Sequence, residues 1–568
     1  MSILVECVPN FSEGSNANTL KVIRESIESV AGVQVLDVDP GVAANRTVFT
    51  FVGSPDGVEE AAVRAIRVAG ERIDMSKHTG EHPRMGATDV CPFVPVQGIT
   101  LEECAQLATR VAERVWNELE IPTYLYESAA SAPHRKRLPD LRKGEYEALE
   151  SKMTDPKWKP DFGGEWSERV AKTGATVIGA RPFLIAWNIN LNTNNQRKAE
   201  KIAATIRDKG SYVRDENGEL KRGDDGKPFR APGMFRHVNA IGWTIDEYGH
   251  CQISCNVLDF TKVGLHTIYD AVRQLALESG VVVTGSELVG LIPLEALLSA
   301  GRHYLREAGE NPGLPHDKLL RVAIRSLGLN DLKPFDPYQS IIEYQIAEDG
   351  PLVAMTVRDF TDLLSSDAPA PGGGSIAALC GALANGLAAM VGQLSTKISA
   401  KSWPYAQPRP AEWDDFDVCA VKAQQLKEAF LRDVDADTEA FDSMMAAMRL
   451  PKATPEQRKV RVQAIKKARR QAIETPLDVL ERCNQTLDCV EVALRGNPNA
   501  RSDAGVASAL VGTCAQGAWM NVMINLQDLK DLERKEVYRT QAEALLTTIE
   551  ERVATQASQV QQFLRESL

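Results

Sequence analysis

The first third of the chain alternates short apolar runs with stretches in which apolar residues recur at helical spacing. Short runs rich in β-branched residues predict strands, and recurrence every three to four residues predicts helices. The expected strands span residues 3–8, 33–38, 47–52, 90–96 and 123–126, and the expected helices span residues 19–31, 57–73 and 101–119. This βαββαβ order with appended elements predicts an open α/β sandwich whose sheet is mainly antiparallel.

A similar order of elements recurs further along the chain. Strands are expected at residues 183–190, 238–245, 252–258 and 281–284, and helices at 195–209 and 267–279. The intervening segment 212–229 is charged and rich in Asp and Gly, which predicts a mobile surface loop. The recurrence indicates two similar α/β subdomains, although no sequence repeat accompanies it.

Beyond residue 356 the pattern becomes almost wholly helical. Long periodic stretches at 418–450, 455–494, 504–526 and 532–564 predict an all-α domain, in the form of a bundle. The segment 335–355 before it contains prolines, charges and a short strand-like run at 341–344, and is expected to be a linker. The predicted fold class is therefore α/β, with two βαββαβ-type subdomains at 1–180 and 181–334, followed by a separate all-α helical domain at 356–568.

Length and composition narrow the classes of protein. A chain of 568 residues is too long for one core and fits three or four domains. The net charge of -12 argues against general nucleic-acid binding, because neutralising phosphates needs a basic face. Ten cysteines without zinc-type spacing favour free thiols in a reducing cytoplasm and no metal site. The chain starts in a strand without a charged leader, and no apolar run is expected to reach membrane-span length, so no membrane is expected as a partner.

The loop at residues 77–89 carries the first candidate chemistry. His78, Glu81, His82 and Arg84 fall within a few residues of each other, and nearby glycines and a proline predict a shaped loop rather than a helix. The His78 and His82 spacing would suit a metal only on a helix, so a metal pair is not favoured. A catalytic histidine and an ordinary surface histidine both remain open from the residues alone.

Longer motifs carry a family resemblance. The run HTGEHPRMGATDVCPFVPV at 78–96, with ECVPNFSEG at 6–14 and DVDPG at 37–41, resembles the formimidoyltransferase-cyclodeaminase family, and the resemblance continues through the helical half. It implies a bifunctional folate enzyme of histidine degradation. Such an enzyme transfers formimidoyl from N-formimidoyl-L-glutamate to tetrahydrofolate, and then cyclises 5-formimidoyltetrahydrofolate to 5,10-methenyltetrahydrofolate with release of ammonia.

The resemblance assigns His82 as the catalytic residue of the transferase half. Protons must leave the attacking nitrogen and reach the departing one, and a group that titrates near neutrality suits both tasks. Asp39 is expected either to orient that imidazole or to form a turn before Pro40. Arg84 is expected either to hold a substrate carboxylate or to form a surface salt bridge.

The resemblance also places folate contacts in two stretches of the α/β half. The first follows the PDFG run at 160–163 and the second is a Pro-Gly loop; ordinary connecting loops are the alternative for both. The residues assigned to folate binding are Gly163, Gly164, Glu165, Trp166, Ser167, Glu168, Arg169, Val170, Ala171, Lys172, Ala231, Pro232 and Gly233.

In the helical half, a glycine-rich loop opens a helix of small residues. Gly372, Gly373, Gly374 and Ser375 allow close backbone approach and expose free N–H groups, but no Walker lysine follows. Tight helix packing is the alternative, and the family match favours a cyclodeaminase site. Residues 372–375 form the glycine-rich loop.

Three acids lie close together on a predicted helix, namely Asp435, Asp437 and Glu439. Such a group is usually a solvated face, but the resemblance assigns Asp437 as the catalytic aspartate that handles protons as N10 attacks and ammonia departs. Asn521 and Asn525, one turn apart, are expected to bond across an oligomer interface. The basic runs 135–137 and 466–470 are the clusters that could retain the polyanionic tail of a folate, and solvated surface is the commoner alternative for such runs.

The partners implied are small molecules: N-formimidoyl-L-glutamate, and tetrahydrofolate as a polyglutamylated co-substrate. The resemblance further implies a cytoplasmic homo-oligomer, of which a ring-like octamer is one form. Three alternatives stay open. The donor could be a formyl compound, as in a glutamate formyltransferase; one activity could be lost; or the chain could be a catalytically dead folate-binding scaffold.

Overall fold

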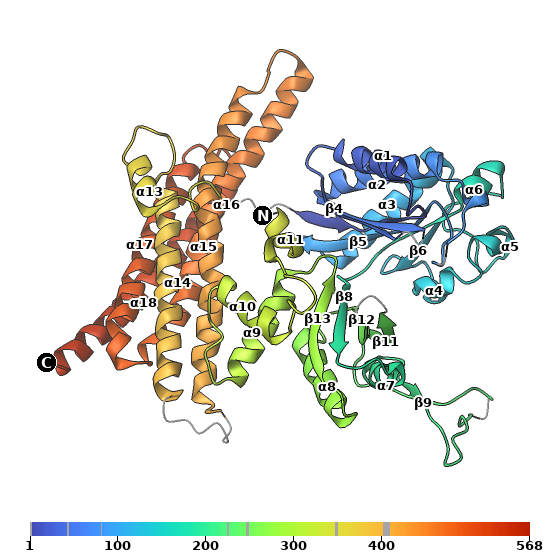
Figure 1. The fold of residues 1–568 in the computed structure, drawn as a ribbon. Helices are drawn as coiled ribbons and strands as arrows, with labels where there is room; N and C mark the ends of the chain where they lie inside the picture. The colour runs from blue at the N-terminus through green and yellow to red at the C-terminus, as the bar shows by residue number, and fades with distance from the viewer. Residues whose placement is uncertain are drawn as a thin grey trace. The chain divides into compact units, whose positions relative to one another are not determined.

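The computed structural model describes residues 3–41, 45–80, 82–223, 226–245, 249–346, 350–400 and 409–568. The chain forms two compact units (Figure 1). The first comprises Met1–Ala296 with Leu327–Ile346, and the second comprises Leu297–Ser326 with Ala347–Leu568. The chain thus crosses between the units three times, rather than once at the expected linker.

The first unit begins with a seven-stranded mixed sheet. Strands β3, β4, β1, β2 and β5 are antiparallel, whereas β5, β7 and β6 are parallel. The strands are β1 Leu4–Cys7, β2 Asn10–Phe11, β3 Gln34–Gly41, β4 Arg46–Gly53, β5 Thr88–Gln97, β6 Thr123–Glu127 and β7 Thr176–Ala180. The expected strands are all present, but the sequence pattern did not predict β7. This strand lies between β5 and β6 and makes that side of the sheet parallel, so the expectation of a mainly antiparallel sheet holds for one side only.

Three helices pack together above this sheet (Figure 1). They are α1 Ala17–Glu28, α2 Pro55–Arg72 and α3 Leu101–Leu119. Each begins where its sequence supplies a cap: Asn16 for α1, Ser54 for α2, and a Thr100–Glu103 capping box for α3. Their buried faces form one apolar core with the sheet. The short helices α4 Leu138–Leu141, α5 Leu149–Thr154 and α6 Glu168–Thr173 surround a smaller core on the β6 and β7 side.

The second α/β layer is a four-stranded antiparallel sheet in the order β11-β12-β8-β13. Its elements agree with the expected ones: β8 Ile185–Leu191, α7 Gln196–Ile206, β11 Val238–Ile245, β12 His250–Val257, α8 Leu265–Glu278 and β13 Val283–Val289. The segment expected as a plain loop contains paired strands, β9 Ser211–Tyr212 and β10 Arg230–Ala231. The guanidinium of Arg230 stacks 3.7 Å above the ring of Tyr212 and closes the base of this hairpin.

The segment expected to be a linker contains structure of its own. Helices α11 Pro337–Ser340 and α12 Ile342–Ile346 lie there, so the strand-like interpretation of 341–344 is wrong. Ile341 makes a single bridge to Ile292, and Ile341 and Ile342 are both buried. A short apolar run does not distinguish a strand from a buried helical turn, which explains the error. Two further helices, α9 Leu294–Glu307 and α10 His316–Ser326, precede this segment, and most of their residues belong to the second unit.

The second unit is built on long helices packed side by side. They are α14 Gly373–Ala400, α15 Glu412–Arg449, α16 Pro455–Leu494, α17 Arg501–Leu526 and α18 Leu532–Glu566, and the short helix α13 Val357–Leu364 precedes them. Alanine and glycine dominate α14, which packs closely against α15 and α17. Large apolar residues from α16 fill the space around it. This part of the fold agrees with the predicted bundle.

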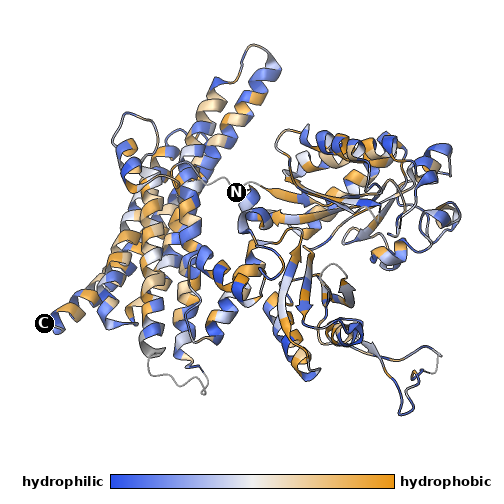
Figure 2. Cartoon of the chain, viewed as in Figure 1, coloured by the Kyte–Doolittle hydropathy of each residue, from blue (hydrophilic) through white to orange (hydrophobic). Residues whose placement is uncertain are grey.

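Helix α14 is apolar along most of its length (Figure 2). Its residues Gly373–Lys397, with a mean hydropathy of 1.7, are long and apolar enough to cross a membrane by length and composition. The expectation that no apolar segment reaches this length is therefore wrong. The Gly and Ala residues of α14 lower its mean hydropathy less than charged residues would. Core helices of soluble proteins meet the same criterion, and about half of this segment, 56%, is buried inside the unit.

Candidate functional sites

The glycine-rich loop and Asp437 come together at the start of α14. Asp437 projects from α15, and its Oδ2 accepts hydrogen bonds from the backbone N–H of Ser375 at 3.2 Å and from the Ser375 hydroxyl at 3.5 Å. The hydroxyl also lies 2.9 Å from the carbonyl oxygen of Val434, so α14 is held against the preceding turn of α15. Sixty-two residues of sequence separate Ser375 from Asp437.

Two opposing effects act on the Asp437 carboxyl. Burial raises its pKa, and the hydrogen bonds from Ser375 lower it by stabilising the anion. Burial is the larger effect, so the pKa is raised from its ordinary value of 3.8. A raised pKa makes the exchange of a proton with a bound substrate easier near neutral pH.

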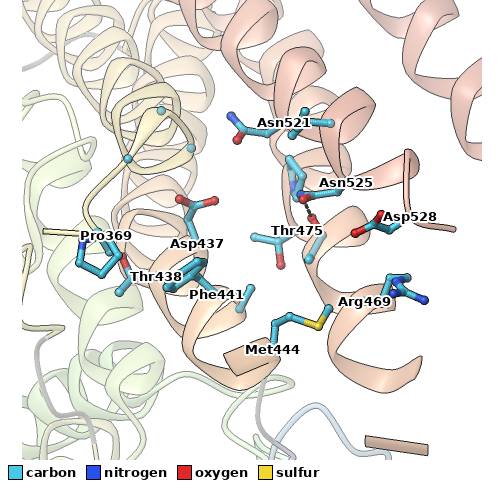
Figure 3. Close-up of a pocket in the computed structure, with 18 of the residues that line it drawn as sticks. Pro369, Asp437, Thr438, Phe441, Met444, Arg469, Thr475, Asn521, Asn525 and Asp528 are labelled. Atoms are coloured by element: carbon cyan, nitrogen blue, oxygen red, sulfur yellow. Dashed lines mark hydrogen bonds between the residues drawn. The ribbon is translucent and has the colours of Figure 1, made fainter. Parts of the chain in front are cut away.

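Asp437 and the loop line a cavity of about 420 Å³ (Figure 3). Helices α15, α16 and α17 supply most of the rest of its wall, together with residues 369–370 and 527–528. The lining residues are Pro369, Ala370, Gly372, Gly373, Gly374, Asp437, Thr438, Ala440, Phe441, Met444, Met448, Arg469, Ala472, Thr475, Pro476, Asn521, Ile524, Asn525, Gln527 and Asp528. The wall combines apolar side chains with polar and charged groups, so it offers a ligand both apolar contacts and hydrogen-bonding partners.

The three neighbouring acids of α15 have different environments. Asp435 is buried and accepts hydrogen bonds from the backbone N–H groups of Leu352 at 2.9 Å and Val353 at 3.3 Å. Glu439 is exposed. Among the three, only Asp437 lines the cavity. The structure thus separates one carboxylate with access to a ligand from one that anchors the chain.

The structure corrects two expectations about this cavity. Asn521 and Asn525 do not need a partner subunit, because their side-chain amides donate to Gly517 O at 2.8 Å and to Ala472 O at 2.7 Å within the chain. Both line the cavity, as does Arg469 from a basic run for which solvated surface is the commoner alternative. Two amides at helical spacing on an apolar helix were the available signal, but spacing alone does not say what the face contacts.

In the α/β unit, both ring nitrogens of His82 have neighbours. Nδ1 lies 2.8 Å from the carbonyl oxygen of Pro83, and Nε2 lies 3.0 Å from Nη1 of Arg46. A carbonyl only accepts and a guanidinium only donates, so the bonds assign a neutral imidazole protonated on Nδ1. Burial and the nearby cations Arg46 and Arg142 lower the pKa of His82, while Asp89 opposes them. His82 is therefore neutral near pH 7, in the state that accepts a proton.

Asp39 does not orient this imidazole. It lies on β3 opposite Val48, and no hydrogen bond joins it to His82 in the described part of the chain. Asp39 instead lines a separate cavity of about 460 Å³ formed with residues 286–291 and 332–336. The carboxylate that favours the His82 cation is Asp89, which is buried, pairs with Arg142 and accepts from the backbone N–H of Met85 at 2.9 Å.

Arg84 already holds carboxylates of its own chain. Its guanidinium bonds to both oxygens of Glu147, at 2.7 and 2.9 Å, and to Glu145 at 3.1 Å. Its Nε donates to Nδ1 of His78 at 3.3 Å, and Nε2 of His78 contacts the Asn45 carbonyl oxygen at 3.2 Å. Arg84 therefore forms salt bridges, as one of its two expectations had it, but it is buried rather than on the surface.

The first predicted folate stretch ends beside the histidine loop. The N–H of Ala87 donates to Thr173 O at 2.7 Å and the N–H of Ala175 to Met85 O at 3.0 Å, and Gly86 bridges Gly174. Within the stretch, Ser167 caps α6 and Gly164 packs so closely on Trp116 that a Cβ would come within 2.8 Å of the ring. The residues that directly follow Gly163–Lys172 therefore contact the histidine loop at Met85–Ala87, and folate binding by the stretch itself stays a prediction.

The second predicted folate stretch lies at the base of the β9–β10 hairpin. Ala231 pairs with Ser211, and the N–H of Gly233 lies 3.4 Å from Asp208 O. A Cβ on Gly233 would clash with the backbone of Arg207. This packing explains the glycine without a ligand, so contact of Ala231, Pro232 and Gly233 with folate also stays a prediction.

Comparison with known proteins covers both units. A mouse formimidoyltransferase-cyclodeaminase is 41% identical over 99% of this chain and 98% of its own length. A Streptococcus pyogenes glutamate formimidoyltransferase is 40% identical over 54% of this chain and 94% of its own. A Methylorubrum extorquens methenyltetrahydrofolate cyclohydrolase is 34% identical over 34% of this chain and 88% of its own.

The chain thus joins an α/β unit that holds His82 to a helical unit that holds Asp437 at a cavity, and each half resembles an enzyme, which is the organisation of a two-domain folate enzyme. Residues 4–181 match the family model "Formiminotransferase domain, N-terminal subdomain", residues 186–347 match "Formiminotransferase domain", and residues 356–544 match "Formiminotransferase-cyclodeaminase". The chain belongs to the formimidoyltransferase-cyclodeaminase family.

Proposed function

We propose that this chain carries out two successive reactions on one folate, with His82 and Asp437 as the catalytic residues of the two steps. The α/β half transfers formimidoyl from N-formimidoyl-L-glutamate to N5 of tetrahydrofolate. The helical half cyclises the product to 5,10-methenyltetrahydrofolate and releases ammonia. The observation that carries the proposal is the junction of Asp437 with the glycine-rich loop in one cavity, because it provides a proton-exchanging group beside a ligand-sized space.

In the transferase step, N5 of tetrahydrofolate attacks the formimidoyl carbon and forms a tetrahedral intermediate. Nε2 of neutral His82 accepts the proton that N5 loses, and the imidazolium then protonates the departing nitrogen of glutamate. The pKa of His82, lowered by burial and neighbouring cations, suits this base, and the Pro83 carbonyl oxygen holds its ring. Arg46 donates to the same Nε2, so this bond must break when the substrate N–H arrives.

In the cyclisation step, N10 attacks the formimidoyl carbon already on N5. Asp437 removes the proton from N10 and delivers it to the departing nitrogen, which leaves as ammonia while N5 and N10 remain joined through the carbon. The formimidoyl group reacts as its protonated amidinium, whose departing nitrogen already carries two hydrogens. The proton from N10 therefore completes ammonia, and the positive charge stays on the methenyl bridge, so one carboxyl suffices. Burial supports this role by raising the pKa of Asp437, which brings its protonated form within reach.

One assay separates the two sites. The purified chain with tetrahydrofolate and N-formimidoyl-L-glutamate should produce the absorbance of the methenyl product. His82→Ala should stop transfer and still cyclise supplied 5-formimidoyltetrahydrofolate. Asp437→Ala should transfer and let that intermediate accumulate. If either variant retained both steps at the wild-type rate, the catalytic assignment of its residue would be wrong.

The setting of these reactions is part of the proposal. We infer a cytoplasmic homo-oligomer of histidine degradation, with a ring-like octamer as one form, that takes polyglutamylated folate. All ten cysteines are free thiols and nine are buried, which suits a reducing compartment. Exposed apolar side chains on the helical unit, such as Leu383, Val418 and Val506, suit burial between subunits. Light scattering that gave only a monomer would refute the assembly.

Two other functions have specific tests. A formyl donor needs the same proton transfers, so product analysis with formyl- and formimidoyl-glutamate decides which acyl group moves. A dead scaffold would bind folate tightly without turnover. The cavity at Asp437 and the neutral His82 favour catalysis over this alternative.

A further inference from the structure

The cyclodeaminase cavity has charged groups on two sides. Asp437 and the glycine-rich loop form one side, and Arg469 and Asp528 lie across the cavity from them (Figure 3). Phe441 and Met444 of α15 belong to the apolar wall of the same cavity. A ligand that spans this space therefore places one end near a reacting carboxylate and the other near a guanidinium.

Arg469 is the one cation among the residues that line the cavity. It is half-buried, and in the described part of the chain its guanidinium has no ion pair and no hydrogen bond. The neighbouring Arg470 differs, because its Nε bonds to Glu474 at 2.8 Å on the surface of α16. The half-buried Arg482 also has an acid partner, Asp433, at 2.6 Å. An arginine at the wall of a cavity whose guanidinium donors are unused is available for an anionic group of a ligand.

The substrate of the proposed cyclisation has one strongly anionic part, the glutamate. The benzoyl ring separates this glutamate from the reacting N10, so it binds away from the catalytic carboxylate. Asp437 and Asp528 both repel it, and Arg469 attracts it. The pteridine edge carries N–H donors, which suit the carbonyl oxygens of the wall better than a guanidinium.

We propose that Arg469 binds the glutamyl carboxylate of folate in the cyclodeaminase cavity and so sets the direction in which the substrate lies. This inference rests on the proposed function and adds a substrate-positioning residue to it. Arg469 touches the substrate far from the reacting carbon. It therefore affects KM more than kcat, because Asp437 and the glycine-rich loop stay intact.

The test compares 5-formimidoyltetrahydrofolate with the same compound lacking glutamate, 5-formimidoyltetrahydropteroate, in the full chain. In the wild type, loss of the glutamate should raise KM by about 10- to 100-fold, the range expected for a charge-assisted hydrogen bond. Arg469→Gln should raise KM for the folate by a similar factor and leave KM for the pteroate unchanged. Arg469→Lys, which keeps the charge but not the paired donors, should recover part of the difference.

Arg470→Gln is the matched control and should discriminate between the substrates as the wild type does. If Arg469→Gln raised KM equally for both compounds, or still discriminated like the wild type, the assignment would be overturned. Should the wild type cyclise both compounds with one KM, the role of Arg469 fails while the cyclodeaminase function stands. A wild type that cyclises neither compound overturns the proposed function and this inference together.

Discussion

Replacing Gly374 by alanine tests the geometry of the carboxylate site. A methyl group at Gly374 would lie 2.6 Å from Oδ2 of Asp437 and nearer still to Oδ1, whereas real Cβ contacts under 3.0 Å are essentially never seen. The carboxylate has to retreat by roughly 1 Å, and a misplacement of that size costs about 100-fold in rate. The move also breaks the 3.2 Å bond from the Ser375 N–H.

The assay is cyclisation of supplied 5-formimidoyltetrahydrofolate, with formimidoyl transfer measured on the same sample. Gly374→Ala should lower kcat for cyclisation about 100-fold and leave transfer unchanged. Gly372→Ala is the control from the same loop, because a methyl there meets nothing within 4 Å. If Gly374→Ala cyclised at the wild-type rate, or if Gly372→Ala were equally slow, Asp437 would not be the group whose position matters.

Three further predictions concern charge and burial. The pKa of His82 is lowered, so kcat/KM for transfer should stay constant as pH falls to 6.5 and should decrease only below pH 6.5. A decrease that begins above pH 6.5 would contradict the neutral imidazole. Burial raises the pKa of Glu6 from 4.5 to about 7. Below pH 4.5 its carboxyl is protonated in the folded and the unfolded chain, and stability is highest. Between pH 4.5 and 7 only the unfolded chain ionises, so the free energy of unfolding falls as pH rises and levels off above pH 7. At pH 8, Glu6→Gln should therefore raise the unfolding free energy of the first unit by about 3 kcal/mol relative to the wild type, measured by denaturant titration. If the variant's unfolding free energy equalled or fell below that of the wild type, Glu6 would not be buried as a charge. Asp435→Ala should cost about 1–3 kcal/mol of stability, because the N–H groups of Leu352 and Val353 lose their acceptor. Asp437→Ala should instead lose activity with little loss of stability. If the two variants had equal melting temperatures, the distinction between the two carboxylates would be wrong.

The sequence was sufficient for features that depend on local periodicity and local capping. The helix predicted at 101–119 agrees with α3 Leu101–Leu119 because its apolar spacing and its Thr100–Glu103 cap are both written within a few residues. The long helices of the bundle were predicted for the same reason. The family motifs likewise picked out His82 and Asp437, which the structure places at a held imidazole and at a cavity wall.

Only the tertiary structure decided which side chains meet. Asp39 is distant from the histidine loop in sequence, and in the described part of the chain it makes no hydrogen bond to His82. The carboxylate that raises the pKa of His82 is Asp89. Arg469 and Arg470 are adjacent and chemically identical in sequence, yet one faces a cavity and the other bonds to Glu474 on the surface. The physical reason is that the hydrophobic pattern along a chain indicates which residues are buried. Contacts between side chains about 60 residues apart, such as Ser375 and Asp437, depend instead on how separate helices pack. The burial and the charge of a site follow from that packing.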